Sequence, residues 1–206
     1  MKIGIIGSGN IGATLARLFH TANHEIAISN SRGPESLAEL VQELGAGARA
    51  TTAEEAAAFG DVVVEAIPFG RYKDLPTQQL AGKILVTASN YYPQRDGVIA
   101  LQGQAQSELL ADYLSGARVV KAFNTIWYQH LQRQGDTAKP LEERRVIPIA
   151  GDDQDAKQIV SGLISDIGFA PLDMGSLHNS THQEPDAAIY NKDLTLADAR
   201  TLLKSL

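Results

Sequence analysis

Residues 2–12 read KIGIIGSGNIG, and they govern how the rest of the chain is interpreted. An apolar run leads directly into the pattern G-x-G-x-x-G, and the amphipathic stretch 11–19 follows. Between a buried strand and a helix, this pattern is typical of a turn that binds the pyrophosphate of a dinucleotide. Gly7 permits the tight turn, Gly9 lets the backbone approach the pyrophosphate, and Gly12 lets helix and strand pack closely. The alternative is a glycine-rich turn that binds nothing.

Short apolar runs alternate with amphipathic stretches along most of the chain. Runs that are apolar on both faces indicate a parallel sheet covered by helices on both sides. We therefore predict an α/β fold, a doubly wound and mostly parallel sheet of the Rossmann dinucleotide-binding type, with a small C-terminal extension. Residues 1–126 would form the core, and 127–206 would complete the sheet and the acceptor side of the cleft. The expected strands are 3–6, 25–29, 61–67, 84–87, 119–123, 146–150 and 170–172, and the expected helices are 11–19, 34–44, 153–167 and 196–203.

Composition excludes several classes of function. The 206 residues hold 18 basic and 24 acidic side chains and no cysteine. Disulfides, thiolate metal sites and a cysteine nucleophile are thereby ruled out. The net charge of −6 argues against a nucleic-acid partner. A membrane span needs about 20 consecutive apolar residues, which the chain lacks, and its first apolar run is too short for a signal peptide. We expect a cytoplasmic protein with no membrane partner.

The end of the second predicted strand indicates which dinucleotide binds. NAD-selective proteins place an acidic residue about 20 positions after the glycine motif, where it holds the ribose hydroxyls. Here the sequence is Ser29-Asn30-Ser31-Arg32, with no acid before Glu35. A hydroxyl and a guanidinium suit the 2′-phosphate of NADPH, which a carboxylate would repel. We predict NADP(H) as the cofactor. The alternative is that Arg32 is a solvated loop cation and that Asn30 and Ser31 only shape the turn.

In this fold ligands lie beyond the carboxyl ends of the strands. The residues that leave those ends are poor in acids and bases and rich in apolar, amide and hydroxyl side chains. Such a cleft suits hydride transfer between two bound planar molecules, where orientation matters more than proton transfer. The predicted cofactor-binding residues are Gly7, Ser8, Gly9, Asn10, Ile11, Gly12, Ser29, Asn30, Ser31, Arg32, Ile67, Pro68, Ser89 and Asn90.

No catalytic acid or base is required, so no catalytic residue is assigned. Candidates for the acceptor side are His130, Asn124 and Tyr91. Each has a structural alternative, because Tyr91 can be a packing aromatic and Asn124 can cap the following segment. His178 and His182 are four residues apart, but no carboxylate motif adjoins them, and we predict no metal site.

The ordered set of motifs resembles a known family, the deazaflavin-dependent NADP oxidoreductases that use coenzyme F420, together with their bacterial relatives. The likeness runs over about residues 1–177. It is carried by the glycine motif and by Ser29-Asn30-Ser31-Arg32-Gly33-Pro34-Glu35-Ser36, Ala66-Ile67-Pro68, Ser89-Asn90-Tyr91-Tyr92, Val120-Lys121-Ala122-Phe123-Asn124-Thr125, Ala150-Gly151-Asp152-Asp153 and Asp173-Met174-Gly175-Ser176-Leu177.

The resemblance implies reversible hydride transfer between NADP(H) and C5 of 8-hydroxy-5-deazaflavin, usually by a homodimer. It places the 2′-phosphate contacts on Ser31 and Arg32. The chain departs from the family where better-known members carry further basic residues, because Gly33-Pro34-Glu35-Ser36 follows the serine–arginine pair. The family extends to domains that pass hydride to flavins, so FMN, FAD or a quinone-like molecule is an alternative acceptor. Two other hypotheses are a small imine or 3-hydroxy acid reductase and an NADP(H)-binding sensor or scaffold without turnover.

Overall fold

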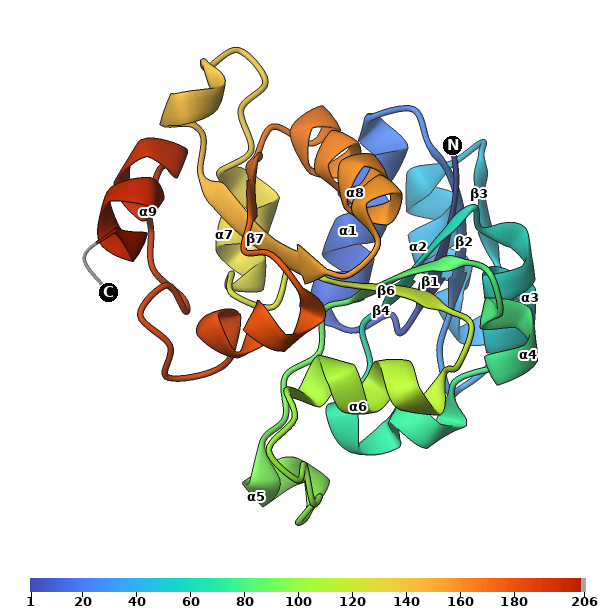
Figure 1. The fold of residues 1–206 in the computed structure, drawn as a ribbon. Helices are drawn as coiled ribbons and strands as arrows, with labels where there is room; N and C mark the ends of the chain where they lie inside the picture. The colour runs from blue at the N-terminus through green and yellow to red at the C-terminus, as the bar shows by residue number, and fades with distance from the viewer. Residues whose placement is uncertain (205–206) are drawn as a thin grey trace.

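An eight-stranded sheet with the order β3-β2-β1-β4-β5-β6-β7-β8 runs through the computed structural model, which describes residues 1–204 (Figure 1). Neighbouring strands are parallel except for β6 and β7, which are antiparallel. The doubly wound α/β fold is therefore confirmed. The strands are β1 (Lys2–Ile6), β2 (Glu25–Ser29), β3 (Ala48–Ala50), β4 (Val62–Glu65), β5 (Ile84–Thr87), β6 (Arg118–Lys121), β7 (Val146–Gly151) and β8 (Ala170–Asp173).

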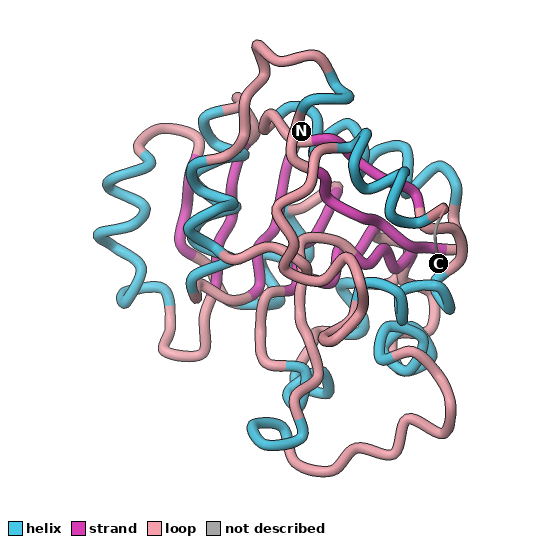
Figure 2. Tube along the Cα trace, turned by 90° about the vertical axis from the view of Figure 1, so that its left-hand side faces the viewer, coloured by secondary structure: helices cyan, strands magenta, loops and turns pink. Residues whose placement is uncertain are grey.

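Helices cover both faces of this sheet and enclose two apolar cores (Figures 1 and 2). On one face, residues such as Leu15, Leu131 and Val160 come from α1 (Asn10–Thr21), α7 (Tyr128–Arg133) and α8 (Gln154–Asp166). On the other face, Ala56 and Leu110 come from α3 (Ala53–Phe59) and α6 (Gln106–Tyr113), and α4 (Thr77–Leu80) adds to this core. Strands β1, β4 and β5 are buried on both faces, which explains their continuous apolar sequence.

The C-terminal part adds a third, smaller core at the far edge of the sheet. Val146 and Ala170 from β7 and β8 pack there against Leu196 and Ala199 of α9 (Leu196–Leu203). Short helices complete the fold: η1 (Pro34–Leu37), α2 (Ala38–Leu44), η2 (Phe69–Asp74), α5 (Pro93–Asp96), η3 (Leu141–Glu143) and η4 (Leu177–Gln183). Figure 1 shows α5 projecting from the body beyond α6. The boundary at residue 126 stays a prediction, since one sheet joins both sides of it.

Several local features differ from the sequence prediction, which placed no helix at α4, α5 or α6. The expected helix 34–44 is a 3-10 turn followed by a separate α-helix, with Leu37 at the junction. The strand β3 was not predicted, because Ala48–Ala50 is too short for a periodic signal. The helix α3, of seven residues, was not predicted either. The start of α3 nevertheless has a capping box, which can be recognised in the sequence. The Thr52 hydroxyl accepts a hydrogen bond from the Glu55 N–H, and the Glu55 carboxylate accepts one from the Thr52 N–H.

The glycine turn gives a direct test of the packing between β1 and α1. A Cβ added to Gly12 would lie 1.8 Å from the carbonyl oxygen of Gly7, whereas a Cβ on Gly9 meets no atom within 4 Å. We expect Gly12→Ala to lower the free energy of unfolding by about 1–3 kcal/mol, the usual cost of overpacking. Gly9→Ala is the matched control and should stay within about 0.5 kcal/mol of the wild type. Urea denaturation measures both, and equal stability of the two variants would contradict this account of the turn.

Candidate functional site

The turn between β1 and α1 has the geometry of an anion site. Gly7 has φ +108°, and a Cβ there would lie 2.5 Å from the carbonyl oxygen of Ala66, so only glycine fits. The Gly7 N–H donates to the Ser29 carbonyl at 3.0 Å, which fixes the turn against β2. Helix α1 begins after Gly9 with no side-chain cap and no acidic residue in its first turn. Its first N–H groups and its positive dipole end are therefore free to meet phosphate.

Asn30 connects this turn to the loop that follows β2. Its side-chain N–H₂ donates to the hydroxyl oxygens of Ser8 at 3.1 Å and Ser36 at 2.9 Å. Its side-chain carbonyl accepts the backbone N–H of Arg32 at 2.9 Å. These hydrogen bonds of the Asn30 side chain therefore fix the conformation of the loop.

Ser29, Ser31 and Arg32 lie in different environments. Ser29 is fully buried, and its hydroxyl donates to the Ile5 carbonyl at 3.2 Å, so its side chain holds the two strands together. Ser31 and Arg32 are exposed at the cleft. Within residues 1–204, no ion pair or hydrogen bond of the protein engages the Arg32 guanidinium. That guanidinium is free for an anionic ligand.

Three adjoining cavities form a trough along the carboxyl edge of the sheet. The first, of about 370 Å³, lies between the turn, Arg32 and the residues after β4. The second, of about 300 Å³, shares Gly9, Ile67 and Pro68 with the first. The third, of about 300 Å³, shares Asn10 and other residues with the second. The predicted residues Ile11, Ser89 and Asn90 line the second cavity, whereas Gly12 serves the packing of α1 and lines none of the three.

The three acceptor-side candidates are not together. Asn124 lines the third cavity, and its side-chain oxygen Oδ1 is buried without a hydrogen-bond partner among the described residues. The Tyr91 hydroxyl donates to the Gly97 carbonyl at 2.9 Å, and its ring packs against Phe69. His130 lies beside Trp127, with its Nδ1 3.5 Å from the Arg145 guanidinium. The placement of Tyr91 matches its packing interpretation, and Asn124 is the candidate that faces the trough.

Sequence reasoning missed a second tyrosine at the trough. Tyr190 lines the third cavity and Tyr92 the second, and their hydroxyl oxygens lie 2.6 Å apart. Burial raises the pKa of Tyr190, so this phenol stays protonated. Tyr190 lies 98 residues beyond Tyr92, in a polar segment without periodicity, and no local pattern could have paired the two.

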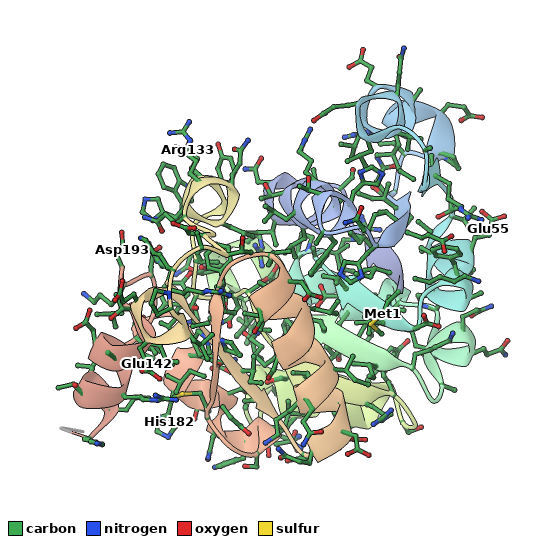
Figure 3. All side chains as sticks on the ribbon, turned by 90° about the horizontal axis from the view of Figure 1, so that it is seen from above. Met1, Glu55, Arg133, Glu142, His182 and Asp193 are labelled. Atoms are coloured by element: carbon green, nitrogen blue, oxygen red, sulfur yellow. The ribbon has the colours of Figure 1, made fainter. Side chains whose placement is uncertain are left out.

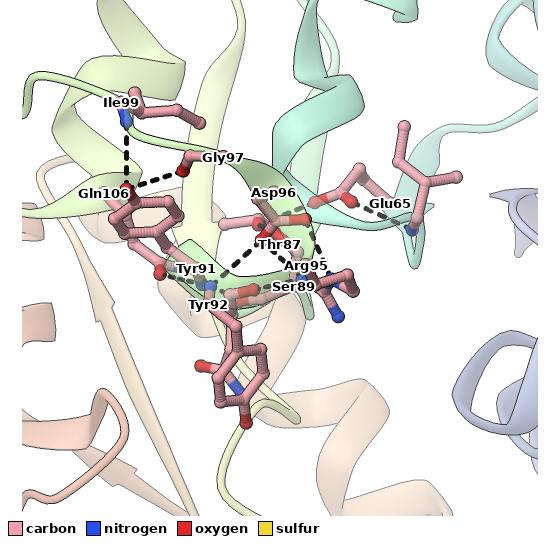
Figure 4. Close-up of polar contacts among 12 residues, drawn as sticks. Glu65, Thr87, Ser89, Tyr91, Tyr92, Arg95, Asp96, Gly97, Ile99 and Gln106 are labelled. Carbon is pink, nitrogen blue, oxygen red and sulfur yellow. Dashed lines mark hydrogen bonds and ion pairs between the residues drawn. The ribbon is translucent and has the colours of Figure 1, made fainter.

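Two charged side chains, Glu65 and Lys121, are buried next to residues that line the second cavity, and Figure 4 shows Glu65 beside Thr87. The Glu65 carboxylate accepts hydrogen bonds from the Ile67 N–H at 3.0 Å and the Thr87 hydroxyl at 2.7 Å. The ammonium group of Lys121 donates to the carbonyl of Ser89. Burial raises the pKa of Glu65 and lowers that of Lys121 to about 8. Because Ile67 and Ser89 line the cavity, these buried groups hold its floor in place.

The buried ammonium makes the stability of the fold depend on pH. In the folded chain Lys121 has a pKa of about 8, against 10.5 for an ordinary lysine. Between these values the unfolded chain holds a proton that the folded chain has released, so stability rises with pH. We expect the free energy of unfolding of the wild type to increase relative to that of Lys121→Met across this range. Denaturation at a series of pH values tests this, with Lys139→Met as the control for loss of an exposed charge. If the free energies of unfolding of the wild type and Lys121→Met differ by the same amount at every pH, the lowered pKa of the buried Lys121 is contradicted.

The two spaced histidines lie outside the trough. His178 is exposed, with its Nδ1 3.1 Å from a carboxylate oxygen of Glu108. Figure 3 shows His182 at the outer rim of the C-terminal part. In residues 1–204, no three or more His, Cys, Asp or Glu side chains are grouped so that they could hold a metal ion. Among the helices of the same residues, none has both the length and the apolar character needed to cross a bilayer.

Comparisons with known proteins agree with this geometry. The sequence profile of the family described as "NADP oxidoreductase coenzyme F420-dependent" matches residues 2–91. The rat metalloreductase STEAP3 is 36% identical over 185 residues, which are 89% of this chain and 36% of the relative. The chain thus spans about a third of the length of the curated metalloreductases it matches.

Solved structures extend the likeness over the whole fold. A hypothetical protein from Sinorhizobium meliloti is 35% identical, with a TM-score of 0.83 and 95% of both chains covered. A candidate F420-dependent NADP reductase from Arthrobacter sp. is 22% identical, with a TM-score of 0.73, covering 100% of this chain and 91% of the other. At this identity the second likeness shows the fold alone. By its matched profile over residues 2–91 and its dinucleotide-binding fold, the chain is related to the coenzyme F420-dependent NADP oxidoreductases.

Proposed function

We propose that this protein is an NADPH-dependent oxidoreductase that exchanges a hydride with a deazaflavin or flavin-like acceptor. The observation that carries the proposal is the continuous trough, which leads from a free guanidinium past a bare helix N-terminus to an apolar and amide-lined end. The guanidinium, the helix N-terminus and the apolar end follow one another along the trough in the same order as the 2′-phosphate, the pyrophosphate and the nicotinamide along NADPH. The match to the NADP oxidoreductase profile supports the cofactor, and the acceptor is the finer part of the proposal.

The first cavity suits the adenosine half of the cofactor. Ser31 and Arg32 lie at its rim, where a 2′-phosphate would find a hydroxyl donor and a positive charge. The pyrophosphate would lie over Gly9, where the open space above the backbone allows close approach. The free N–H groups of α1 would donate to it. The residues present therefore fit the cofactor.

The second and third cavities suit the nicotinamide and the acceptor. Arg95 is the one charged residue that lines either of them in the described part of the chain, and Asp96 and the Asn90 carbonyl hold its guanidinium at 2.8 and 2.6 Å. The bound cofactor supplies the hydride, and the chain orients the two rings and excludes water. Ile67 and Pro68 form an apolar wall, and the orphaned Oδ1 of Asn124 offers an acceptor for an amide or ring N–H.

The acceptor class follows from the shape and chemistry of this end. In the described chain no Asp, Glu, His, Lys or Arg lines the third cavity, and the Tyr190 hydroxyl there is hydrogen-bonded to that of Tyr92 at 2.6 Å. A planar ring system that takes a hydride directly needs no carboxylate, imidazole or ammonium group beside it. The matching profile is that of coenzyme F420-dependent enzymes, which supports a deazaflavin. Flavins are the alternative acceptors that the sequence resemblance implies. The homodimer, and the cytoplasmic location, remain predictions from the sequence.

The direct test is NADPH oxidation with a panel of deazaflavins, flavins and quinones. We expect turnover with at least one planar acceptor and none with Gly9→Val, whose Cβ meets no protein atom within 4 Å and whose methyl groups would lie in the pyrophosphate path. Circular dichroism checks that this variant is folded. Tight NADPH binding without turnover on the whole panel would favour the sensor hypothesis instead.

The preference for NADPH rests on the free guanidinium at the first cavity. Arg32→Ala should weaken NADPH binding by about 1.5–3 kcal/mol, the cost of a lost charged hydrogen bond, and leave NADH binding nearly unchanged. Fluorescence titration with both cofactors measures this. An equal loss for both would show that Arg32 does not read the 2′-phosphate.

A further inference from the structure

The adenosine cavity contains a second arginine on its opposite wall. Its charged lining residues in the described chain are Arg32, Arg71 and Asp74. Arg32 comes from the loop after β2, whereas Arg71 and Asp74 come from η2, which follows β4. The cavity is therefore flanked by guanidinium groups from both sides. The segment after Arg32 contributes no cation, since Gly33, Pro34 and Glu35 follow it.

The second guanidinium is held by a carboxylate three residues further along. Arg71 donates from Nε to the Asp74 carboxylate at 2.6 Å, and its Nη2 lies 2.6 Å from the same oxygen. The two side chains are 58% and 53% exposed. Ion pairs that face solvent in this way contribute little to stability. The pair is therefore easily exchanged for a stronger partner.

A phosphate monoester is such a partner. At neutral pH it carries about 1.5 to 2 negative charges and three acceptor oxygens, more than a carboxylate offers to a guanidinium. Arg71 and Asp74 both line the cavity, so a phosphate bound there would compete with Asp74 for the guanidinium. Asp74 in turn places a negative charge beside any phosphate bound there, which weakens its binding.

We infer that Arg71 is a second specificity-determining residue for the 2′-phosphate of NADPH and that Asp74 competes with the phosphate for it. The inference rests on the proposed function and deepens it. Arg71 thereby supplies the positive charge that is missing after Arg32. The discrimination between NADPH and NADH then depends on both walls of the cavity, and the Asp74 carboxylate limits how tightly NADPH is held.

Titration of the protein with NADPH and with NADH tests this without reference to turnover. Arg71→Gln keeps the length of the side chain and removes its charge. We expect it to raise the Kd for NADPH about tenfold, as for loss of one charge-assisted hydrogen bond, and to change the Kd for NADH less than about twofold. Asp74→Asn removes the competing charge and should lower the Kd for NADPH several-fold, again with little effect on NADH.

Lys73→Gln is the matched control. Lys73 lies between the two residues in η2, but its ammonium group is over the Tyr72 ring and it lines a different cavity. It should leave both constants unchanged. If Lys73→Gln weakens NADPH binding as much as Arg71→Gln does, general electrostatics explain the effect and the inference is wrong.

The remaining outcomes separate this inference from the proposed function. A wild type that binds NADPH, with Arg71→Gln indistinguishable from it, overturns the inference alone. An equal loss of NADPH and NADH affinity places Arg71 on a group that both cofactors share and also overturns it. A wild type that shows no saturable uptake of NADPH overturns the proposed function together with the inference. All three variants change exposed side chains, and circular dichroism verifies their folding.

Discussion

The contact between Gly12 and the carbonyl of Gly7 is the constraint on which the site depends. It brings α1 so close to β1 that no side chain fits between them. The start of the helix is thereby fixed at the carboxyl edge of the sheet, with its N–H groups pointing past Gly9. The Gly7 N–H bond to Ser29 anchors the same turn to the neighbouring strand. The anion site, the loop with Arg32 and the trough all follow from this arrangement.

The chemistry of the trough changes along its length because each strand end contributes different residues. At the β1 and β2 ends the protein presents backbone N–H groups and a guanidinium, which suit phosphates. At the β4, β5 and β6 ends the residues are apolar, hydroxyl and amide groups. Glu65 and Lys121 are buried below this second half, where they hold backbone atoms, and Arg95, which lines the second cavity, is paired with Asp96. Apart from this Arg95–Asp96 pair, the described residues that line the second and third cavities are uncharged, which favours the passage of a hydride over the passage of a proton.

Most of the fold could be predicted from the sequence because its central strands are buried on both faces and carry uninterrupted apolar runs. The glycine turn between β1 and α1 could be predicted because the backbone geometry that requires its glycines is local in the sequence. The short strand β3 could not, since three residues carry no period. Nor could the pairing of Tyr92 with Tyr190 or the place of Arg71, because these depend on which loops meet in space. Ser29 was predicted as a cofactor-binding residue. It lines the first cavity, and its hydroxyl donates to the Ile5 carbonyl, a bond that the sequence pattern does not show.

The C-terminal part matters to the site through a few contacts that close its acceptor end. Gln183 is fully buried. Its side-chain N–H₂ donates to the backbone carbonyl of Lys121 at 3.2 Å, and its backbone carbonyl accepts from the side-chain N–H₂ of Asn124 at 2.6 Å. The N–H of Asn191 donates to the Thr125 carbonyl at 3.0 Å, which brings Tyr190 against the third cavity. Loss of these bonds would leave the end of β6 with unsatisfied buried polar groups. The segment 177–191 is thus required for the shape of the acceptor end, even though the phosphate half of the trough is built entirely from earlier residues.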